Sequence, residues 1–386
     1  MAPVLPQELL DQVVDHLWDD RKALIACNAA GRVFVPAARS HIFCDAAVGG
    51  LLACERVERV LDGSPDTARY VRTLKVVAHH FTYQAGAYRN IDSSWVSRIP
   101  ALVVRFPRLD ALELESLNWN TLRLCPARIS PFLKAVSRLS SLVLTNVHFG
   151  CSSQIKDVLC VATRITELRC DRVYWSYWSP QRPSCLPELQ DSREPSPLRR
   201  LVLRPGSPSI LFTKWLLHPG CELHIQDINV RWREREHTGA LGDLLRASGV
   251  HLESLYLELP SSVAAEALSY NSLDLSANPN LRRIQFEGPV LPDCCNWVPA
   301  LITQIVSTKV ATIDVLLMAP WTQDLHAFDW ALLNRALSHP RFEGVRVTFD
   351  VSLALWQASN QAVVHDIVFN ALPDFRSRGE LVVTCS

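Results

Sequence analysis

The chain has 386 residues, with 39 lysines and arginines against 39 aspartates and glutamates, so its formal net charge at pH 7 is zero. This balance excludes binding to nucleic acid or to an anionic membrane by bulk electrostatics. A hydrophobic fraction of 48% excludes a disordered chain. At about 100–200 residues per domain, the length predicts two or three domains or one long repeat array.

Twelve cysteines are scattered along the chain, several of them inside apolar runs. No C-x-x-C pair occurs, and no group of histidines and cysteines has zinc-ligand spacing, so the sequence predicts no metal and no cofactor. The first residues do not resemble a signal peptide, and no apolar run approaches the roughly 20 residues that cross a bilayer. We therefore expect an intracellular protein, cytoplasmic or nuclear, with reduced thiols and with neither a membrane nor a nucleic acid as a partner.

Three short helices are expected in residues 1–45. The segment 5–17 has apolar residues at three- and four-residue steps, and Pro6 lies in the first turn, where a missing N–H is tolerated. Asp19-Asp20 can cap a second helix over about 22–30, and a third helix follows. Three helices of this size are marginal as an independent core. One face is therefore expected to be completed by a partner or by the following domain.

This segment resembles an F-box in its Leu-Pro start, its helix spacings and its Arg-x-Phe end. The matching residues are Leu5, Pro6, Glu8, Leu9, Leu10, Val13, Val14, His16, Leu17, Leu24, Cys27, Arg32, Phe34, Arg39, Ile42 and Phe43. F-box modules dock onto a Skp-type adaptor and so onto a cullin–RING ubiquitin ligase. The resemblance implies that the adaptor contacts are Leu5, Pro6, Leu9, Leu10, Val13, Val14 and Leu17. Some of these residues must also hold the module together, and the alternative is a plain helical cap on the next domain.

A helical junction is expected at residues 46–70. Leucines and valines at 51–61 indicate a helix that ends at the turn cluster 62–65. Fungal F-box proteins with leucine-rich repeats look similar across this junction.

From residue 71 onward the pattern apolar-x-x-apolar-x-apolar recurs. Its copies begin at Val71, Leu109, Leu139, Ile165, Leu198, Ile225, Leu252, Leu281, Val310 and Phe342, and a weaker strand follows at Leu381-Val382-Val383. Chance alone gives roughly 40 windows of this pattern. The copies nevertheless recur every 26 to 38 residues, with a helical segment between most of them. A strand followed by a helix in each unit is typical of a leucine-rich-repeat solenoid.

The predicted fold is therefore an α/β repeat, with the F-box-like module followed by a leucine-rich-repeat-like solenoid, an irregular horseshoe, at 71–386. It is expected to be irregular because the asparagine that the family has at the ninth position is absent. Leu117, Val147 and Val173 stand there in three copies, so other groups must bond the turn backbone.

Residues 176–197 interrupt the period with no helix or strand pattern, and we expect an insertion loop there. The competing fold is a doubly wound α/β domain. The chain has no glycine-rich nucleotide-binding loop, which argues against the nucleotide-binding versions of that fold.

Between the apolar positions of each strand, the side chains face the other side of the sheet, which in a horseshoe is the concave surface. Acidic residues at these positions are Glu113, Glu115, Glu167 and Asp171, and the arginines are Arg169, Arg200, Arg204 and Arg231, with Arg233 just beyond. This basic stripe is a candidate for holding an acidic peptide or a phosphate group through bidentate contacts. The alternative is a solvated face whose charges offset one another.

An aromatic run, Tyr174, Trp175, Tyr177 and Trp178, precedes the expected insertion. Aromatic anchors of this kind bind partner proteins or pack loops. Signatures of hydrolases and zinc proteases are missing, so no catalytic residue is predicted and the chain is expected not to be an enzyme. The resemblance implies a substrate-recognition subunit of a Skp–cullin–F-box ubiquitin ligase, with the arginines and aromatic residues binding an unknown protein substrate. The alternatives are a leucine-rich-repeat protein-binding scaffold that recruits no ligase and, third, an α/β enzyme.

Overall fold

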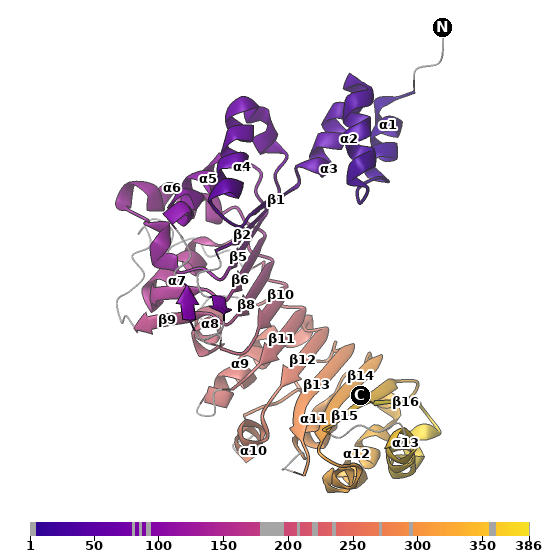
Figure 1. Cartoon of the computed structure of the whole chain (residues 1–386). Helices are drawn as coiled ribbons and strands as arrows, with labels where there is room; N and C mark the ends of the chain where they lie inside the picture. The colour runs from indigo at the N-terminus through magenta and orange to yellow at the C-terminus, as the bar shows by residue number, and fades with distance from the viewer. Residues whose placement is uncertain are drawn as a thin grey trace. The chain divides into compact units, whose positions relative to one another are not determined.

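The computed structural model describes residues 5–78, 82–84, 87–89, 94–177, 197–206, 209–217, 223–233, 237–269, 272–292, 296–354 and 360–385. In these residues the chain is a mixed α/β protein with twelve parallel strands (Figure 1). It divides into two compact units, residues 1–191 and residues 192–386.

The first unit begins with three helices, as the sequence predicts: α1 (Gln7–Asp15), α2 (Arg21–Ala30) and α3 (Val35–Ile42). Asp20 caps α2, because its carboxylate accepts the backbone N–H groups of Lys22 and Ala23 at 3.0 Å each. The core of this module is small. It consists of Val14, Leu24, Ala37 and Ala38, with Leu17, Cys27, Phe34 and Ile42 packed against it.

Five parallel strands follow in the first unit, in an order that matches the sequence. They are β1 (Asp45–Val48), β2 (Thr73–Val77), β5 (Ala111–Glu115), β6 (Ser141–Thr145) and β8 (Glu167–Asp171). Between them lie the helices α4 (Leu51–Gly63), α5 (Ile99–Arg105), α6 (Pro126–Val136) and α7 (Ser152–Val161). A separate antiparallel pair consists of β3 (Thr82–Gln84) and β4 (Ala87–Arg89).

Strand β1 lies at the start of the segment that was expected to be a helical junction. It pairs in parallel with β2, from Asp45 opposite Thr73 to Val48 opposite Val76. Only Val48 of its four residues is buried. A strand this short, with two alanines, shows no apolar alternation, and so the sequence does not reveal it. The predicted helix is present as α4.

The turns after β5, β6 and β8 are bonded by backbone groups. Ser116, Asn146 and Arg172 each have positive φ, between 51° and 54°. After each of them an apolar residue turns inward, and these residues, Leu117, Val147 and Val173, are buried. Here the chain forms a second parallel ladder, in which His148 N–H donates to the Leu117 carbonyl at 2.8 Å and Tyr174 N–H to the Val147 carbonyl at 2.9 Å. The strands β7 (His148–Cys151) and β9 (Tyr174–Tyr177) continue it, and so satisfy the turn backbone in place of the missing asparagines.

The left-handed conformation of Asn146 gives a test of these turns. Asn146→Val places a β-branched residue at φ 54° and removes the 3.2 Å hydrogen bond from Asn146 Nδ2 to Ser116 Oγ. We expect the free energy of unfolding to fall by about 1–3 kcal/mol, measured by urea denaturation. Asn146→Gly, which tolerates this φ, should change it by less than about 1 kcal/mol. Equal stability of the valine variant and the parent would contradict the assigned turn.

The second unit has seven parallel strands, again in an order that matches the sequence. They are β10 (Arg200–Leu203), β11 (Asp227–Arg231), β12 (Ser254–Glu258), β13 (Arg283–Val290), β14 (Thr312–Ala319), β15 (Arg346–Leu353) and β16 (Glu380–Cys385). The helices between them are α8 (Ser209–Leu216), α9 (Thr238–Ser248), α10 (Ser261–Ser269), α11 (Trp297–Gln304), α12 (Trp330–Leu337), α13 (Asn360–Ala371) and α14 (Pro373–Arg376).

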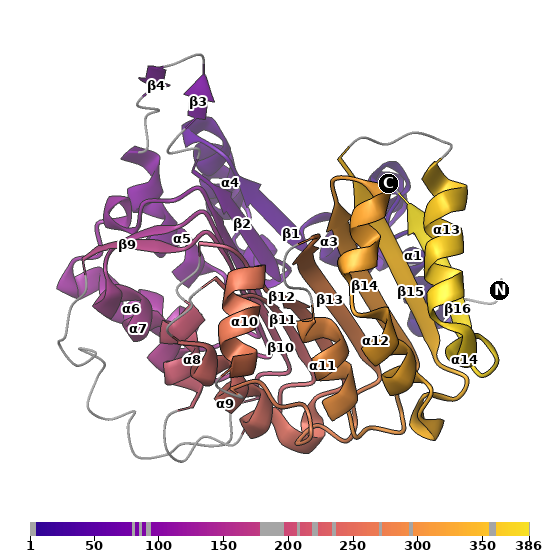
Figure 2. The same cartoon turned by 90° about the horizontal axis from the view of Figure 1, so that it is seen from below.

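One face of this sheet is packed against helices. Figure 2 shows α10, α11 and α12 on the same side of β12–β14. The Phe286 ring on β13 meets Trp297 of α11 at a centroid distance of 5.6 Å, and Phe349 on β15 meets Trp330 of α12 at 5.3 Å. We call the opposite face, formed by the half-buried and exposed strand residues, the open face. In each unit the strands follow the chain order without reversal, so neither has the switch point of a doubly wound fold.

The repeated apolar pattern marks the core. Every apolar template position in the ten copies is buried, and the most exposed of them, Val310, is only 7% exposed. In nine copies the strand begins two residues after the first template position. The tenth copy is shifted, because Thr312 pairs with Arg346 and the register equivalent of Val310 is therefore Gly344, not Phe342. The expected insertion loop falls mostly on residues 178–196, outside the described residues.

Candidate functional site

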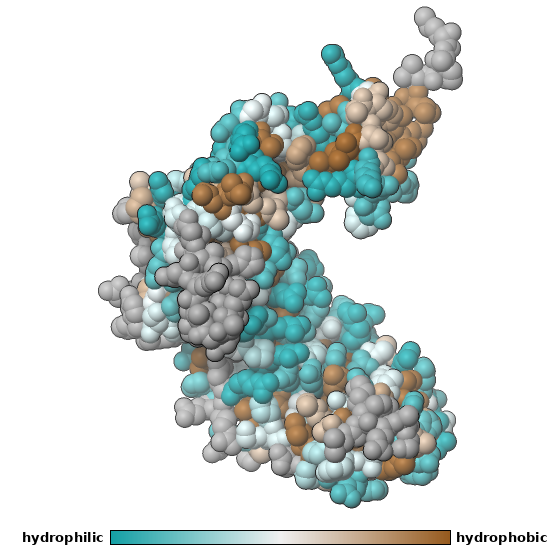
Figure 3. Space-filling view, in the orientation of Figure 1, coloured by the Kyte–Doolittle hydropathy of each residue, from teal (hydrophilic) through white to brown (hydrophobic). Residues whose placement is uncertain are grey.

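The N-terminal module carries large apolar side chains that its own core does not bury. Those on α1 and just before it are Leu5, Leu9 and Val13, which are 58%, 46% and 57% exposed. They recur every four residues and therefore form one stripe. Trp18, Ile25 and Val33 are also exposed. We call the stripe of Leu5, Leu9 and Val13 the apolar face of the module, and Figure 3 shows hydrophobic surface over α1.

The structure separates two roles among the residues expected to contact an adaptor. Val14 is fully buried, Leu17 packs against the module core and Leu10 is half-buried. These three therefore hold α1 onto α2 and α3. By contrast, Leu5, Leu9 and Val13, with Pro6 beside them, lie on the surface. Burial alone makes this distinction, since both sets have the same residue types and helical spacing.

Polar contacts fix the orientation of α1 within the module. Gln7 Nε2 donates to the Val33 carbonyl at 2.8 Å and to Asp11 Oδ1 at 2.7 Å. At the other end of the helix, His41 Nε2 lies 2.7 Å from Asp15 Oδ1. The Gln7 bond holds α1 to Val33, just before α3, and the His41 contact holds it to α3 itself. The stripe on α1 and the exposed Val33 are therefore fixed relative to one another.

Acidic neighbours neutralise three of the five arginines that the sequence placed on a basic stripe. Arg200 Nε lies 3.3 Å from Asp227 Oδ2. Arg231 Nε lies 2.8 Å from Glu258 Oε2, and Arg233 binds the same carboxylate. The partners are in-register neighbours on the next strand, since Arg200 pairs with Asp227 and Arg231 with Glu258. Two of the four acidic residues are paired as well, because Lys75 Nζ lies 3.1 Å from Glu115 Oε2 and 3.8 Å from Glu113 Oε2.

The other two arginines lie in different units. Arg169 is exposed on β8 of the first unit. Arg204, just after β10 in the second unit, is half-buried, and its Nε is buried without a hydrogen-bond partner. Within the described part of the chain, neither has an ion-pair partner. The arginines therefore do not form one free basic stripe, because three of the five form ion pairs with carboxylates of the neighbouring strand.

The aromatic run after β8 lies partly on strand β9. Tyr174 is 44% exposed and Trp175 is half-buried. Tyr177 ends β9, but its side chain and the whole of Trp178 lie outside the described residues. Of the predicted aromatic contacts, Tyr174 is thus the one that the structure places on the surface.

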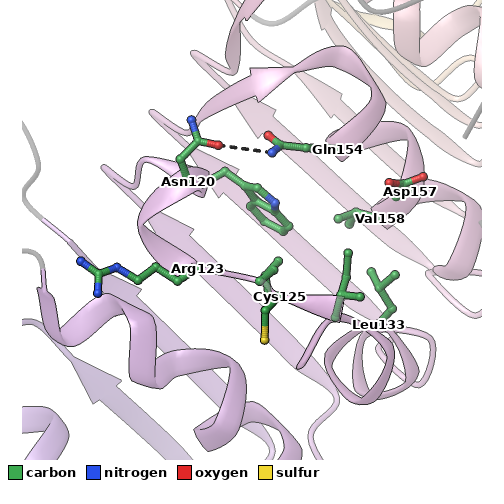
Figure 4. Close-up of a pocket in the computed structure, with 10 residues that line it drawn as sticks. Asn120, Arg123, Cys125, Leu133, Gln154, Asp157 and Val158 are labelled. Carbon is green, nitrogen blue, oxygen red and sulfur yellow. Dashed lines mark hydrogen bonds between the residues drawn. The ribbon is translucent and has the colours of Figure 1, made fainter. Parts of the chain in front are cut away.

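The first unit contains a pocket of about 420 Å³ that the sequence does not predict (Figure 4). Its apolar wall consists of Trp119, Leu124, Ile129, Leu133 and Val158, and its polar residues are Asn120, Arg123, Cys125, Gln154 and Asp157. These residues come from a 3₁₀ helix (Trp119–Leu122), from the segment 123–125 that follows it, from α6 and from α7. No single sequence motif therefore marks the pocket.

A chain of amides closes one side of this pocket. Gln154 Nε2 donates to Asn120 Oδ1 at 3.3 Å, and Gly150 N–H donates to Gln154 Oε1 at 2.8 Å. A Cβ at Gly150 would lie 2.7 Å from Asn120 Oδ1, so a larger residue there would displace the Asn120 side chain. Behind them the Trp119 ring packs on Phe149 at 4.7 Å.

The thiols differ in environment. Burial raises the pKa of Cys54 to about 11, helped by the charge of Glu58, and burial also raises the pKa of Cys170. Both are therefore poor nucleophiles. Cys125, at the pocket, is exposed. Of the eight free cysteines in the described residues, two are buried, Cys54 and Cys170.

The residues that the structure describes contain no cluster of three or more histidines, cysteines or carboxylates able to hold a metal ion. Among the described helices, none is both long and apolar enough to span a bilayer. No known protein family matches the chain. A comparison with curated proteins finds no match.

Proposed function

We propose that this protein is a substrate-recognition subunit of a Skp–cullin–F-box ubiquitin ligase, in which the N-terminal module docks onto a Skp-type adaptor. The apolar face of the module carries this proposal. Large apolar groups that lie together on a small, well-ordered surface mark a site of protein association. The docking residues are then Leu5, just before α1, and Leu9 and Val13 on α1.

The size of the module supports the same conclusion. Its buried core holds four residues, and the exposed apolar residues outnumber them. At about 25 cal/mol per Å² of apolar surface, covering the apolar face would add stability that the module's own core does not supply. A partner that buries this face therefore both binds the module and stabilises it.

The remainder of the chain is proposed to be a leucine-rich-repeat-like solenoid that binds the substrate. Support comes from the regular recurrence of a parallel strand followed by a helix, and from the open face that each unit leaves free of helices. Side chains from successive strands stand in register on this face, so an extended partner segment can contact several strands at once. The chain would contribute no chemistry of its own, because bringing the substrate close to the ligase raises its effective concentration.

Capture of a purified Skp-type adaptor tests the proposal. The full chain is expected to retain the adaptor on a column, and a variant lacking residues 1–45 is expected to lose it, because the apolar face is removed. Circular dichroism of the shortened variant should show that the rest of the chain is still folded. If both proteins retain the adaptor equally, or if neither does, the module is a helical cap and the chain is a scaffold that recruits no ligase.

A further inference from the structure

The open face of the second unit carries an apolar patch at the carboxyl ends of β13 and β14. Val290, Met318 and Trp321 are 39%, 51% and 53% exposed. Val290 and Met318 are register partners on adjacent strands, and Trp321 follows β14 by two residues. Val290 and Met318 lie on the open face, and the exposed Trp321 lies in the segment that follows β14. We call these three residues the β13–β14 patch.

A bulge places Val290 on this face. The register shifts between Glu287 and Val290, and Gly288 has a φ of 110° with its α-hydrogen side against the Leu259 carbonyl. A Cβ at Gly288 would lie 2.4 Å from that oxygen, so only glycine allows the bulge. Without the bulge, strict alternation from Glu287 would turn Val290 toward the helices. The patch is therefore built into the strand geometry.

Two carboxylates lie on the same face, nearer the middle of the strands. Asp314 lies on β14, four residues before Met318, and Asp350 on β15 is the register partner of Leu316. Within the described residues neither has an ion-pair partner, although Thr384 Oγ1 donates to Asp350 Oδ1 at 3.2 Å. The arginine on this face of β15, Arg346, is paired with Glu380 at 3.7 Å. Arg283 on β13, the register partner of Thr312, is exposed on this face as well. The strands that carry the apolar groups thus offer two carboxylates and one arginine, whereas the arginines at β11 are paired with carboxylates.

We propose that this face binds an extended segment of a partner protein in which a lysine or arginine and a large apolar residue stand two positions apart, so that both side chains point toward the face. The inference rests on the proposed function, because that segment is the recognition element of the substrate. Side chains on one face of a strand recur about every 7 Å, which is also the spacing of alternate residues in an extended segment. Cations of such a segment meet Asp314 and Asp350, and its apolar side chains cover Leu316 and the β13–β14 patch. A phosphate-bearing partner does not fit, because two unpaired carboxylates repel it.

A peptide-binding measurement on the full chain tests this. The probe is a fluorescein-labelled ten-residue peptide in which lysine and leucine take turns at the odd positions and serine stands at the even positions, so that lysines and leucines share one face of the extended peptide. Its binding is followed by fluorescence anisotropy. One matched peptide has glutamate in place of lysine, and another has serine in place of leucine. We expect the lysine–leucine peptide to bind and both matched peptides to bind at least tenfold more weakly.

Two paired variants separate the charge from the apolar contribution. Asp314→Asn with Asp350→Asn should weaken binding about tenfold and flatten its salt dependence, because exposed ion pairs are screened by salt. Met318→Ser with Trp321→Ser should also weaken binding about tenfold but leave the salt dependence unchanged. The controls, Asp366→Asn and Val363→Ser, change an exposed aspartate and an exposed valine on α13. They should bind like the parent.

The inference would be overturned by unchanged peptide affinity in both paired variants or by equal binding of the glutamate peptide. It would also be overturned if Met318→Ser with Trp321→Ser changed the sedimentation coefficient of the protein, because the patch would then be a contact between copies of this chain. Adaptor capture is measured on the same proteins. Peptide variants that fail to change binding while the adaptor is still captured overturn only this inference. Peptide binding by a chain that captures no adaptor overturns the proposed function and leaves the face as a peptide-binding surface.

Discussion

Leu255→Asp is expected to abolish the cooperative unfolding transition of the second unit. Leu255 on β12 is 1% exposed, and its neighbours in register are Ile228 and Ile284. Truncating a buried leucine costs about 2–5 kcal/mol, and an unpaired buried carboxylate adds several kcal/mol more. Their sum approaches the whole stability of a domain, about 5–15 kcal/mol. Thermal and urea denaturation followed by circular dichroism would show the loss.

The neighbouring residue provides the matched control for this change. Ser254 lies on the open face of the same strand, half-buried, between Asp227 and Arg283. Ser254→Asp adds the same side chain one residue away but leaves it in contact with solvent, so the melting temperature should move by only a few degrees, about 1 kcal/mol or less. A Leu255→Asp protein that melts close to the parent would show that the strand has the opposite register.

The second large effect is expected from Leu9→Asp combined with Val13→Asp on α1. Both side chains are about half-exposed, so their loss should leave the module folded. In a complex they would be buried, and each is worth about 1.5–3 kcal/mol. Desolvating two carboxylates in their place adds a further penalty. We therefore expect affinity for a Skp-type adaptor to fall at least 100-fold, as measured by titration calorimetry.

Two single variants on the same helix define the meaning of that result. Gln12→Asp changes an exposed polar residue next to the stripe and should bind the adaptor like the parent. Val14→Asp buries a charge in the four-residue core and should unfold the module. Circular dichroism should show that the Leu9→Asp, Val13→Asp protein is as well folded as the parent. Full adaptor affinity in this folded protein would refute docking through this face.

The ion pairs on the open face change how a partner would be recognised. The sequence suggests a central basic stripe, but Arg231 and Arg233 share the carboxylate of Glu258, which is only 6% exposed. Such a cluster fixes the strands in register and presents little free charge. The unpaired charges in the second unit include Asp314 and Asp350 as well as Arg204, so this face has a negative end that the order of residues does not show.

For nine of the ten repeated copies, the position of the strand and its helix-facing side were determined by the sequence alone. The pattern that places Leu112, Leu142 or Leu257 in the core depends only on local alternation, which every copy repeats. The three N-terminal helices were likewise readable, because Asp20, Pro6 and the apolar steps are local signals. The short strand β1 and the shifted register at Val347 could not be read from the sequence, because a few neighbouring apolar residues fit more than one register.

Only the tertiary structure decided which residues are free to function. Leu9 and Val14 have the same helical signal, and burial against α2 and α3 alone assigns one to the surface and the other to the core. Zero net charge likewise says nothing about pairing. Register across strands couples Arg231 to Glu258, and among the described residues it gives Asp314 no ion-pair partner. The bulge at Gly288 turns Val290 outward. These outcomes depend on contacts between segments distant in the chain, where no local pattern carries information.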